Sequence, residues 1–395
     1  MSASTTIIFA KQALINGVWT KSVKVDIHDS TIREVTIGAD PRLIAQPFTT
    51  VAYLTPSYVD LQVNGGAGVL LDQAVTADDI LTVAKAHQPF GTGALLPTLI
   101  TNNTSTMLNM ANAVSAVLHE PDVDVLGVHF EGPWLATAKK GIHLTKHIRP
   151  PSDQELQCIT RKDIGKVMVT LAPEMVPIDI IQDLVQQGVV VSLGHTNAQS
   201  DSALAAIAAG ASGFTHLYNA MSGFSGRAPG VIGAALSDLS TYAGMIVDLH
   251  HVHPTSLRAA MHAKGTDYSV LVTDAMAHVG SVKTRLPYFD LNIQREGDKL
   301  TTPDGSLAGS CLTMHQAVQN TVTHCAQPWA TAVKMASLNP LKWLGLTHLG
   351  DIASGLQANL LGCSTDQSRL DNTICDTPNL HITEHWVKGK CIYER

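Results

Sequence analysis

Short apolar runs alternate with segments of helical period along the middle of the chain. Each run has four to six residues, and the segment that follows repeats its apolar positions every three or four residues. Eight such runs occur: Tyr58–Val63, Gly93–Leu96, Val125–Phe130, Val167–Leu171, Val189–Leu193, Gly213–His216, Ala243–Val247 and Val270–Thr273. This alternation predicts strand–helix units and a parallel sheet, so the expected fold class is α/β.

Two of the intervening helices carry start and stop signals. The first is predicted to begin at Thr76, to end before Gly91, and to share one face among Ile80, Val83, Ala84 and His87. The second is predicted to begin at Asp201, to stop at Gly210, and to carry a stripe of Leu204, Ile207 and Ala208.

Eight strand–helix units within residues 56–358 favour a (β/α)8 barrel of the TIM type, whose usual length is about 250 residues. A doubly wound open sheet is the alternative, but it requires a glycine-rich fingerprint after its first strand. The segment Asn64–Gly68 is rich in glycine, yet it has neither the GxGxxG spacing nor a GK[ST] ending. It is therefore a weak signal for a phosphate loop.

The two ends of the chain differ from the middle. Residues 1–55 consist of short alternating stretches broken by turn residues, and residues 359–395 have the same character. Neither part shows a helical period. We therefore expect both ends to pair into one small β-sandwich domain beside the barrel.

Composition narrows the possible partners and compartments. The 395 residues include 26 basic and 33 acidic side chains, a net charge of −7, which disfavours nucleic acid as a partner. The chain lacks a signal-like start and any apolar run near the roughly 20 residues of a membrane span, so no membrane association is expected. Six scattered cysteines without a CxxC pair suit a reducing compartment, and we expect a cytoplasmic protein.

Polar side chains follow four of the predicted strands, at the end where a barrel carries its chemistry. These residues are Glu131, His195, His216 and Asp274. Taken singly, each is better explained as a turn-former or a hydrogen-bonded group. Together they suggest a site for zinc or a similar divalent cation, in which three protein ligands leave one position for water.

A second histidine cluster, Asp248–His253, follows the seventh run and contains an HxH pair. In metal-dependent hydrolase barrels the HxH pair follows the first strand, where this chain has Gln62 and Asn64. We therefore interpret the later cluster as an anion site, with Arg227 as the matching guanidinium. The alternative is that Arg227 caps a helix or faces solvent.

Seven motifs together resemble the N-acetylglucosamine-6-phosphate deacetylases of the amidohydrolase superfamily. They are Asp60–Gly65, Gly127–Trp134, Lys140–His143, Gly194–Thr196, Thr215–Met221, Thr273–Ala275 and Leu307–Ser310. The resemblance runs in register from about Pro56 to Leu360, and the motifs HFEGPW and THLYNAM are the specific ones.

The resemblance implies a role for each matching residue. It makes Glu131, His195 and His216 the ligands of one divalent ion, with zinc expected before iron, cobalt or manganese. Asp274 becomes the catalytic base and acid, and His143 the group that polarises the acetyl carbonyl. Gln62 and Asn64 become neighbours of a single-metal site.

The resemblance also implies a phosphate site. Its members are Arg227, His251 and the backbone amides of Asn219 and Ala220, although His250 and His253 are neighbouring alternatives to His251. Arg227 and His251 are expected to complete the site of a neighbouring subunit, which implies a homodimer or a tetramer.

The expected activity is hydrolysis of N-acetylglucosamine 6-phosphate to glucosamine 6-phosphate and acetate. The N-acetylgalactosamine epimer, or another N-acyl substrate, is an alternative. The segment Met276–His278 after Asp274 is bulkier than expected, and its bulk could change which sugar fits. The alternative outside enzymes is a catalytically inactive scaffold barrel.

Overall fold

A parallel eight-stranded sheet forms the centre of the molecule. The computed structural model describes residues 5–365 and 379–395. The strands of this sheet follow one another in chain order, and each overlaps one of the eight apolar runs. They are β5 (Tyr58–Val63), β8 (Thr92–Ile100), β9 (Gly127–Glu131), β10 (Lys166–Leu171), β11 (Val190–Leu193), β12 (Gly213–Phe214), β13 (Tyr242–Met245) and β14 (Ser269–Leu271).

The first and last strands of this sheet meet, so the sheet curls into a nearly closed barrel. Val63 and Ala275 form a parallel bridge, and the Asn64 N–H donates to the Ala275 carbonyl at 2.8 Å. Lower in the seam, the buried Asp60 carboxylate accepts a hydrogen bond from the Thr273 N–H at 3.2 Å. The predicted (β/α)8 architecture is confirmed, and the open doubly wound sheet is excluded.

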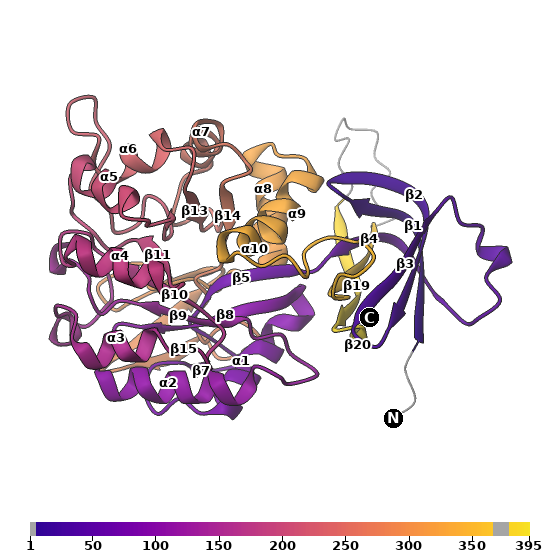
Figure 1. The fold of residues 1–395 in the computed structure, drawn as a ribbon, viewed down its shortest axis with the longest axis horizontal. Coiled ribbons are helices and arrows are strands. Elements are labelled where there is room, and N and C mark those ends of the chain that lie inside the picture. The colour runs from indigo at the N-terminus through magenta and orange to yellow at the C-terminus, as the bar shows by residue number, and fades with distance from the viewer. Residues whose placement is uncertain (1–4, 366–378) are drawn as a thin grey trace.

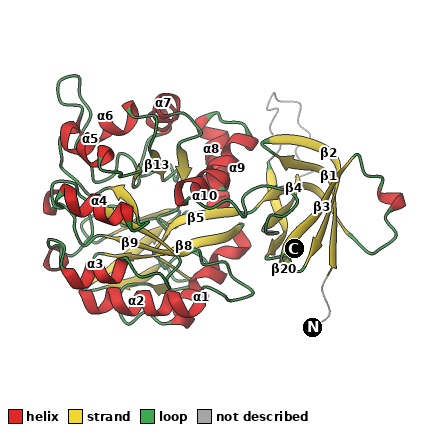
Figure 2. Ribbon diagram, in the orientation of Figure 1, coloured by secondary structure: helices red, strands yellow, loops and turns green. Residues whose placement is uncertain are grey.

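Helices form a ring around the barrel (Figure 2). They are α1 (Ala77–His87), α2 (Thr104–Val117), α3 (Asp153–Ile159), α4 (Ile178–Gln186), α5 (Ser200–Ala208), α6 (Gly230–Ser237), α7 (Pro254–Lys264), α8 (Met314–Cys325), α9 (Trp329–Ala336) and α10 (Leu338–Leu344). The start of α1 is capped by Thr76, whose hydroxyl accepts from the Asp79 N–H. The buried face predicted for this helix is confirmed: Ile80, Val83, Ala84 and His87.

The stripe predicted for α5 is wrong. The helix turns Ala203 and Ala206 inward, whereas Leu204 remains 44% exposed. Small side chains let the backbone of α5 pack closely against α6 and the barrel, and Leu204 lies about 100° further round the helix. Hydropathy alone predicts leucine rather than alanine as the buried residue, but the close packing of α5 leaves room only for the alanines on its inner face.

The two chain ends share one seven-stranded sheet beside the barrel (Figure 1). Its order is β20 (Lys390–Glu394), β19 (Leu380–Val387), β18 (Leu360–Thr365), β4 (Thr49–Pro56), β1 (Thr5–Ile15), β2 (Val18–His28) and β3 (Thr31–Ile37). Only β1 and β4 pair in parallel. The expected pairing of both β-rich ends is confirmed, and β18 joins it by hydrogen bonding to β4.

A small antiparallel sheet between β14 and α8 was not predicted. It consists of β15 (Arg285–Tyr288), β16 (Leu291–Glu296) and β17 (Lys299–Thr301). Tyr288, Ile293 and Leu300 pack from this sheet against Ile100 and Met276 at the end of the barrel. The sheet therefore covers one side of the barrel mouth.

The glycine-rich segment after β5 is a tight hairpin of β6 (Gly65–Gly66) and β7 (Val69–Leu70). A Cβ atom on Gly65 would lie 2.4 Å from the Val69 carbonyl oxygen, so the hairpin needs glycine at this position. The glycine serves close backbone packing at the barrel seam.

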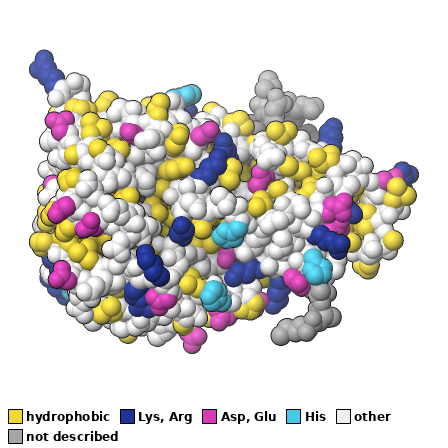
Figure 3. Space-filling model, in the orientation of Figure 1, with side chains coloured by type: hydrophobic (Ala, Val, Ile, Leu, Met, Phe, Trp, Pro, Cys, Tyr) yellow, Lys and Arg dark blue, Asp and Glu magenta, His cyan; other side chains and the backbone are white. Residues whose placement is uncertain are grey.

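Acidic and basic side chains are interspersed on the face shown in Figure 3. Within residues 5–365 and 379–395, no helix combines the length and apolar character needed to cross a membrane. The cysteines Cys158, Cys311, Cys325, Cys363 and Cys391 are free thiols, and Cys375 lies outside the described residues.

Candidate active site

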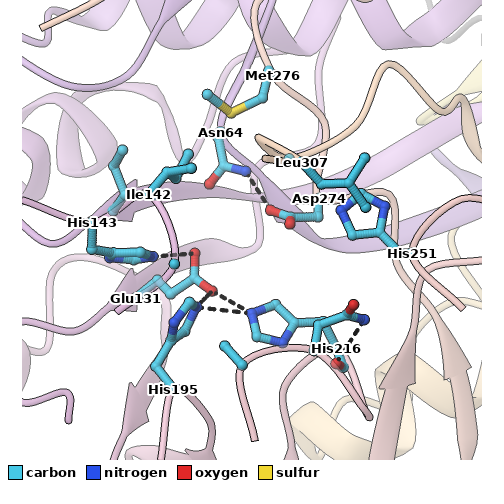
Figure 4. A pocket seen from close by; sticks show the side chains of 15 residues that line it. Asn64, Glu131, Ile142, His143, His195, His216, His251, Asp274, Met276 and Leu307 are labelled. Carbon is cyan, nitrogen blue, oxygen red and sulfur yellow. Dashed lines mark hydrogen bonds and ion pairs between the residues drawn. The ribbon is translucent and has the colours of Figure 1, made fainter. Parts of the chain in front are cut away.

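A cavity opens at the carboxyl ends of the barrel strands and gathers most of the predicted site residues (Figure 4). The predicted residues that line it are Asn64, Glu131, His143, His195, His216, Asn219, Ala220, His251 and Asp274. Gln62 is buried beside them and contacts two of the carboxylates. The lining also includes Ile142, Met276 and Leu307, which form apolar walls.

Three side chains from three strand ends converge on one point. Glu131 is the last residue of β9, and His195 and His216 each lie two residues beyond β11 and β12. Glu131 Oε1 is 3.2 Å from His195 Nε2 and 3.0 Å from His216 Nε2, and the two Nε2 atoms are 3.0 Å apart. All three residues are buried, and they form the one three-ligand cluster found among the described residues.

The donor atoms of this cluster fit a divalent cation. Two ligands at 2.0–2.1 Å from a tetrahedral ion lie about 3.3 Å apart, close to the separations observed here. The His195 Nδ1–H donates to the Lys139 carbonyl at 2.9 Å, so Nε2 directs its lone pair at the carboxylate. Two facing lone pairs repel unless a proton or a cation lies between them, and a cation would satisfy all three ligands.

The backbone bends sharply at three cavity residues that follow barrel strands: His195, His216 and Asp274. His195, His216 and Asp274 have φ values of 48°, 35° and 52°, in the left-handed region that side-chain-bearing residues rarely adopt. Such strain persists where the surrounding structure enforces it. Here it turns three side chains from the strand direction toward the centre of the mouth.

Asp274 lies opposite the ligand cluster and is held by two amides. Its Oδ1 accepts from Asn64 Nδ2 at 2.6 Å and from Gln62 Nε2 at 3.2 Å, and Gln62 also donates to Glu131 Oε1 at 3.0 Å. Burial and the nearby charge of Glu131 raise the pKa of Asp274 to about 6. The carboxylate is therefore a stronger base than an ordinary aspartate.

His143 directs an N–H group into the same space. His143 Nδ1 lies 3.3 Å from the Thr101 N–H and 2.8 Å from the Thr101 hydroxyl oxygen. A neutral ring that accepts the Thr101 N–H at Nδ1 carries its proton on Nε2. Nε2 lies 3.9 Å from Glu131 Oε2. Burial and the adjacent His195 lower the pKa of His143 to about 3, so the ring is a neutral hydrogen-bond donor.

Charge within the cluster favours the ionised carboxylate. Without a cation, a proton on the imidazole Nε2 atoms would take its place. Burial raises the pKa of Glu131, but hydrogen bonds from such N–H groups of His195 and His216 outweigh it and hold the pKa well below its usual range. An anionic oxygen is the form that binds a cation.

Comparison with known proteins identifies the family. Residues 53–392 match the amidohydrolase family model. The chain belongs to the amidohydrolase family. It is 41% identical over 345 residues to an N-acetylgalactosamine-6-phosphate deacetylase of Shewanella sp. (strain ANA-3), covering 87% of this chain and 84% of the relative. It is 33% identical to an N-acetylglucosamine-6-phosphate deacetylase of Haemophilus influenzae (strain ATCC 51907 / DSM 11121 / KW20 / Rd), covering 85% and 86%.

A solved amidohydrolase structure has the same fold throughout. The N-acetylglucosamine-6-phosphate deacetylase of Pasteurella multocida superposes with a TM-score of 0.90 at 29% identity, covering 99% of this chain and all of that one. The protein is therefore a metal-dependent hydrolase, and the resemblance seen in its motifs is confirmed. A barrel without chemistry would be expected to lack ligands, and Glu131, His195, His216 and Asp274 are all present in the cavity.

The three histidines of the Asp248–His253 cluster have different places in this amidohydrolase. His251 lines the cavity, and its Nδ1–H donates to Asp248 Oδ2 at 2.6 Å. His250 instead pairs with Asp298 at 2.8 Å, and His253 caps the start of α7 by accepting from the Thr255 N–H. Of the three, His251 alone lines this cavity.

Arg227 lies outside the cavity of its own chain. It belongs to the exposed part of the loop before α6, which projects from the barrel (Figure 1). The Asn219 N–H already donates to the His216 carbonyl at 2.9 Å, so its predicted use for phosphate would require a change of partner.

Sequence reasoning missed a hydrogen-bonded chain inside the barrel, directly beneath the ligands. The Leu61 carbonyl can only accept, so His129 Nδ1–H donates to it at 2.9 Å, and His129 Nε2 accepts from the Thr170 hydroxyl at 2.7 Å. The Thr215 hydroxyl then donates to Thr170 at 2.6 Å, and Ser192 donates to Thr215 at 2.7 Å. Burial lowers the pKa of His129 to about 4, which keeps the ring neutral. Nothing in the local sequence signals this pairing, because it joins five strands.

Metal removal is expected to destabilise this hydrolase, because the empty cluster holds facing lone pairs. A cation at about 100 times its Kd stabilises the folded state by about 2.7 kcal/mol, so a chelator should lower the Tm and added Zn²⁺ should restore it. His216→Ala should abolish that response, whereas His262→Ala, at an exposed position on α7, should keep it. An unchanged Tm together with no bound metal by elemental analysis would contradict the assignment.

Proposed function

We propose that this amidohydrolase removes the acetyl group from a 2-acetamido-2-deoxyhexose 6-phosphate. The observation that carries the proposal is the arrangement of Asp274 and His143 on either side of the ligand cluster. The products would be the amino-sugar phosphate and acetate. Relatives named for either epimer support this substrate class.

Between the epimers, we propose N-acetylgalactosamine 6-phosphate as the better substrate and N-acetylglucosamine 6-phosphate as the second candidate. The observation behind this order is the higher identity to the Shewanella relative, 41% against 33% for the Haemophilus one. It reverses the order expected from the motifs.

The residues present suit hydrolysis by an activated water. A divalent cation bound by Glu131, His195 and His216 would lower the pKa of a water molecule toward about 7 and polarise the acetyl carbonyl. We propose zinc first, because a Glu and two His ligands with one open position match its catalytic sites. Iron, cobalt or manganese would fit the same ligands.

Asp274 would then act twice. As an ionised carboxylate it accepts the proton of the attacking water, and the hydrogen bonds from Asn64 and Gln62 keep it oriented while it does so. It returns this proton to the leaving nitrogen, because an amine leaves readily only when protonated. A pKa of about 6 suits both directions of transfer near neutral pH.

His143 would stabilise the charge that develops on the acetyl oxygen. Its Nε2–H would be a preorganised donor in the tautomer whose Nδ1 accepts from the Thr101 N–H. The neutral ring gains a hydrogen bond to oxygen as negative charge builds there.

The phosphate would require a cation from outside this chain's cavity. The cavity is lined by two carboxylates and by no lysine or arginine among the described residues. We propose that His251 binds phosphate within the chain and that Arg227 of a second copy supplies the guanidinium, which makes a homodimer or tetramer the active form. Free thiols support a reducing, cytoplasmic setting.

Acetate release tests the function. Zinc-loaded protein is expected to hydrolyse both 6-phosphorylated epimers, with a higher kcat/KM for the galactosamine compound, and to act poorly on the sugars without phosphate. The measurement is acetate produced against time at matched substrate concentrations. Absence of acetate from both epimers would overturn the proposal, and a preference for the glucosamine epimer would reverse the order given above.

Asp274→Asn is expected to lower kcat by at least about 10²-fold, because general acid–base groups contribute at least that much. The variant should retain its metal, since Asp274 is not one of the three converging ligands. Kinetics and elemental analysis on the same preparation check both statements. Loss of the metal would instead make Asp274 a ligand.

Arg227→Ala is expected to raise KM for the phosphorylated sugar by at least about tenfold, the cost of losing charged hydrogen bonds. Mixing this variant with Asp274→Asn decides whether Arg227 acts between subunits. In a mixed dimer one site regains both groups, so refolded equal mixtures should recover about a quarter of wild-type activity. No recovery in mixed dimers would place Arg227 in its own subunit's site.

A further inference from the structure

Asn64 presents an unused hydrogen-bond acceptor to the cavity. It follows β5 directly, and the residue is 2% exposed. Its Nδ2 donates to Asp274 Oδ1 at 2.6 Å, and because a carboxylate can only accept, this contact fixes which end of the amide faces Asp274. The opposite end, Oδ1, has no hydrogen-bond partner among the described residues.

The unpaired oxygen points to a missing donor. A buried carbonyl without a partner destabilises a protein, and most such groups in folded proteins are paired. Asn64 lines the cavity, and in Figure 4 its side-chain oxygen faces the space between His143 and Asp274. The donor would therefore belong to a molecule that occupies this space.

The proposed substrate offers one suitable donor at the reacting bond. An acetamide has a carbonyl oxygen, which His143 and a bound cation would contact, and an N–H group, which needs an acceptor. The leaving nitrogen must come within reach of Asp274 to receive a proton. Since Asn64 and Asp274 are in direct hydrogen-bond contact, a nitrogen beside Asp274 is also beside Asn64.

We infer that Asn64 Oδ1 accepts the hydrogen bond of the scissile amide N–H and is a further catalytic residue of this reaction. The inference rests on the proposed deacetylase function. With the N–H directed at Asn64, the lone pair that appears on nitrogen in the tetrahedral intermediate is free to face Asp274. Asn64 thus holds the base through Nδ2 and aims the leaving group through Oδ1.

Replacing the amide by an ester separates these two roles. The 2-O-acetyl sugar 6-phosphate keeps the acetyl carbonyl and the phosphate but has no N–H. Asn64→Ala removes both contacts. The loss through Asp274 should lower activity on the amide and on the ester, and the loss through Oδ1 should lower activity on the amide only. We expect the amide-to-ester ratio of kcat/KM to fall by about tenfold or more, as for a lost hydrogen bond of about 1.4 kcal/mol.

Gln62→Ala is the matched control. Gln62 also donates to Asp274, but its amide hydrogen bonds with Asp274 and Glu131 inside the protein. This variant should lower kcat/KM for both substrates and measures how far a weaker hold on Asp274 alone changes the ratio. The ratio should fall about tenfold further in Asn64→Ala than in Gln62→Ala. Metal content and Tm, measured on each variant, show that the comparison is made between folded, loaded proteins.

Asn64→Asp provides a second, independent measurement. A carboxyl group that shares a proton with Asp274 keeps an acceptor in the cavity, so total activity should fall while the amide-to-ester ratio stays near that of the wild type. An amide-to-ester ratio in Asn64→Ala no lower than that in Gln62→Ala would overturn the inference and restrict Asn64 to holding Asp274 or the attacking water. Wild-type protein that hydrolyses neither substrate would instead overturn the proposed function, and the inference with it.

Discussion

Three buried lone pairs that converge on one point are the constraint on which this molecule depends. Glu131, His195 and His216 repel one another when neither a proton nor a cation lies between them, so the rest of the fold must hold them together. They come from separate strand ends, and each histidine itself has a left-handed backbone conformation. The closed barrel supplies the rigidity, because its seam between β5 and β14 fixes the last strand relative to the first.

Hydrogen bonds inside the barrel also help to hold the three ligands in place. The hydroxyl chain through Thr170, Thr215 and Ser192 has a single direction, set by the carbonyl that accepts from His129. His129 and Glu131 lie two residues apart on β9 and point to the same face, and Thr215 precedes His216. A shift of any of these strands would therefore move a ligand and leave a buried hydroxyl unpaired. The cluster geometry is a property of the sheet as a whole.

Much of this arrangement could be predicted from local patterns, and the rest depends on tertiary contacts. Apolar runs located the eight strands, and polar residues at their ends located Glu131, His195, His216 and Asp274 in one cavity. The inward face of α5 and the sheet β15–β17 were missed because close helix packing and an insertion leave no periodic signal. Asn64 was expected only as a neighbour of the metal; its contact with Asp274 depends on the closure of the barrel.

Two neutral amides at the end of β5, Gln62 within the strand and Asn64 directly after it, hold the Asp274 carboxylate. A second cation there would bind the carboxylate and suppress its basicity. Gln62 and Asn64 orient the same carboxylate through hydrogen bonds that leave its pKa near neutrality, at about 6. A group poised in this way can accept a proton from water and release it to nitrogen within one turnover. Two amides at this position therefore suit a carboxylate that exchanges protons, as proposed for Asp274, better than one that binds a second cation.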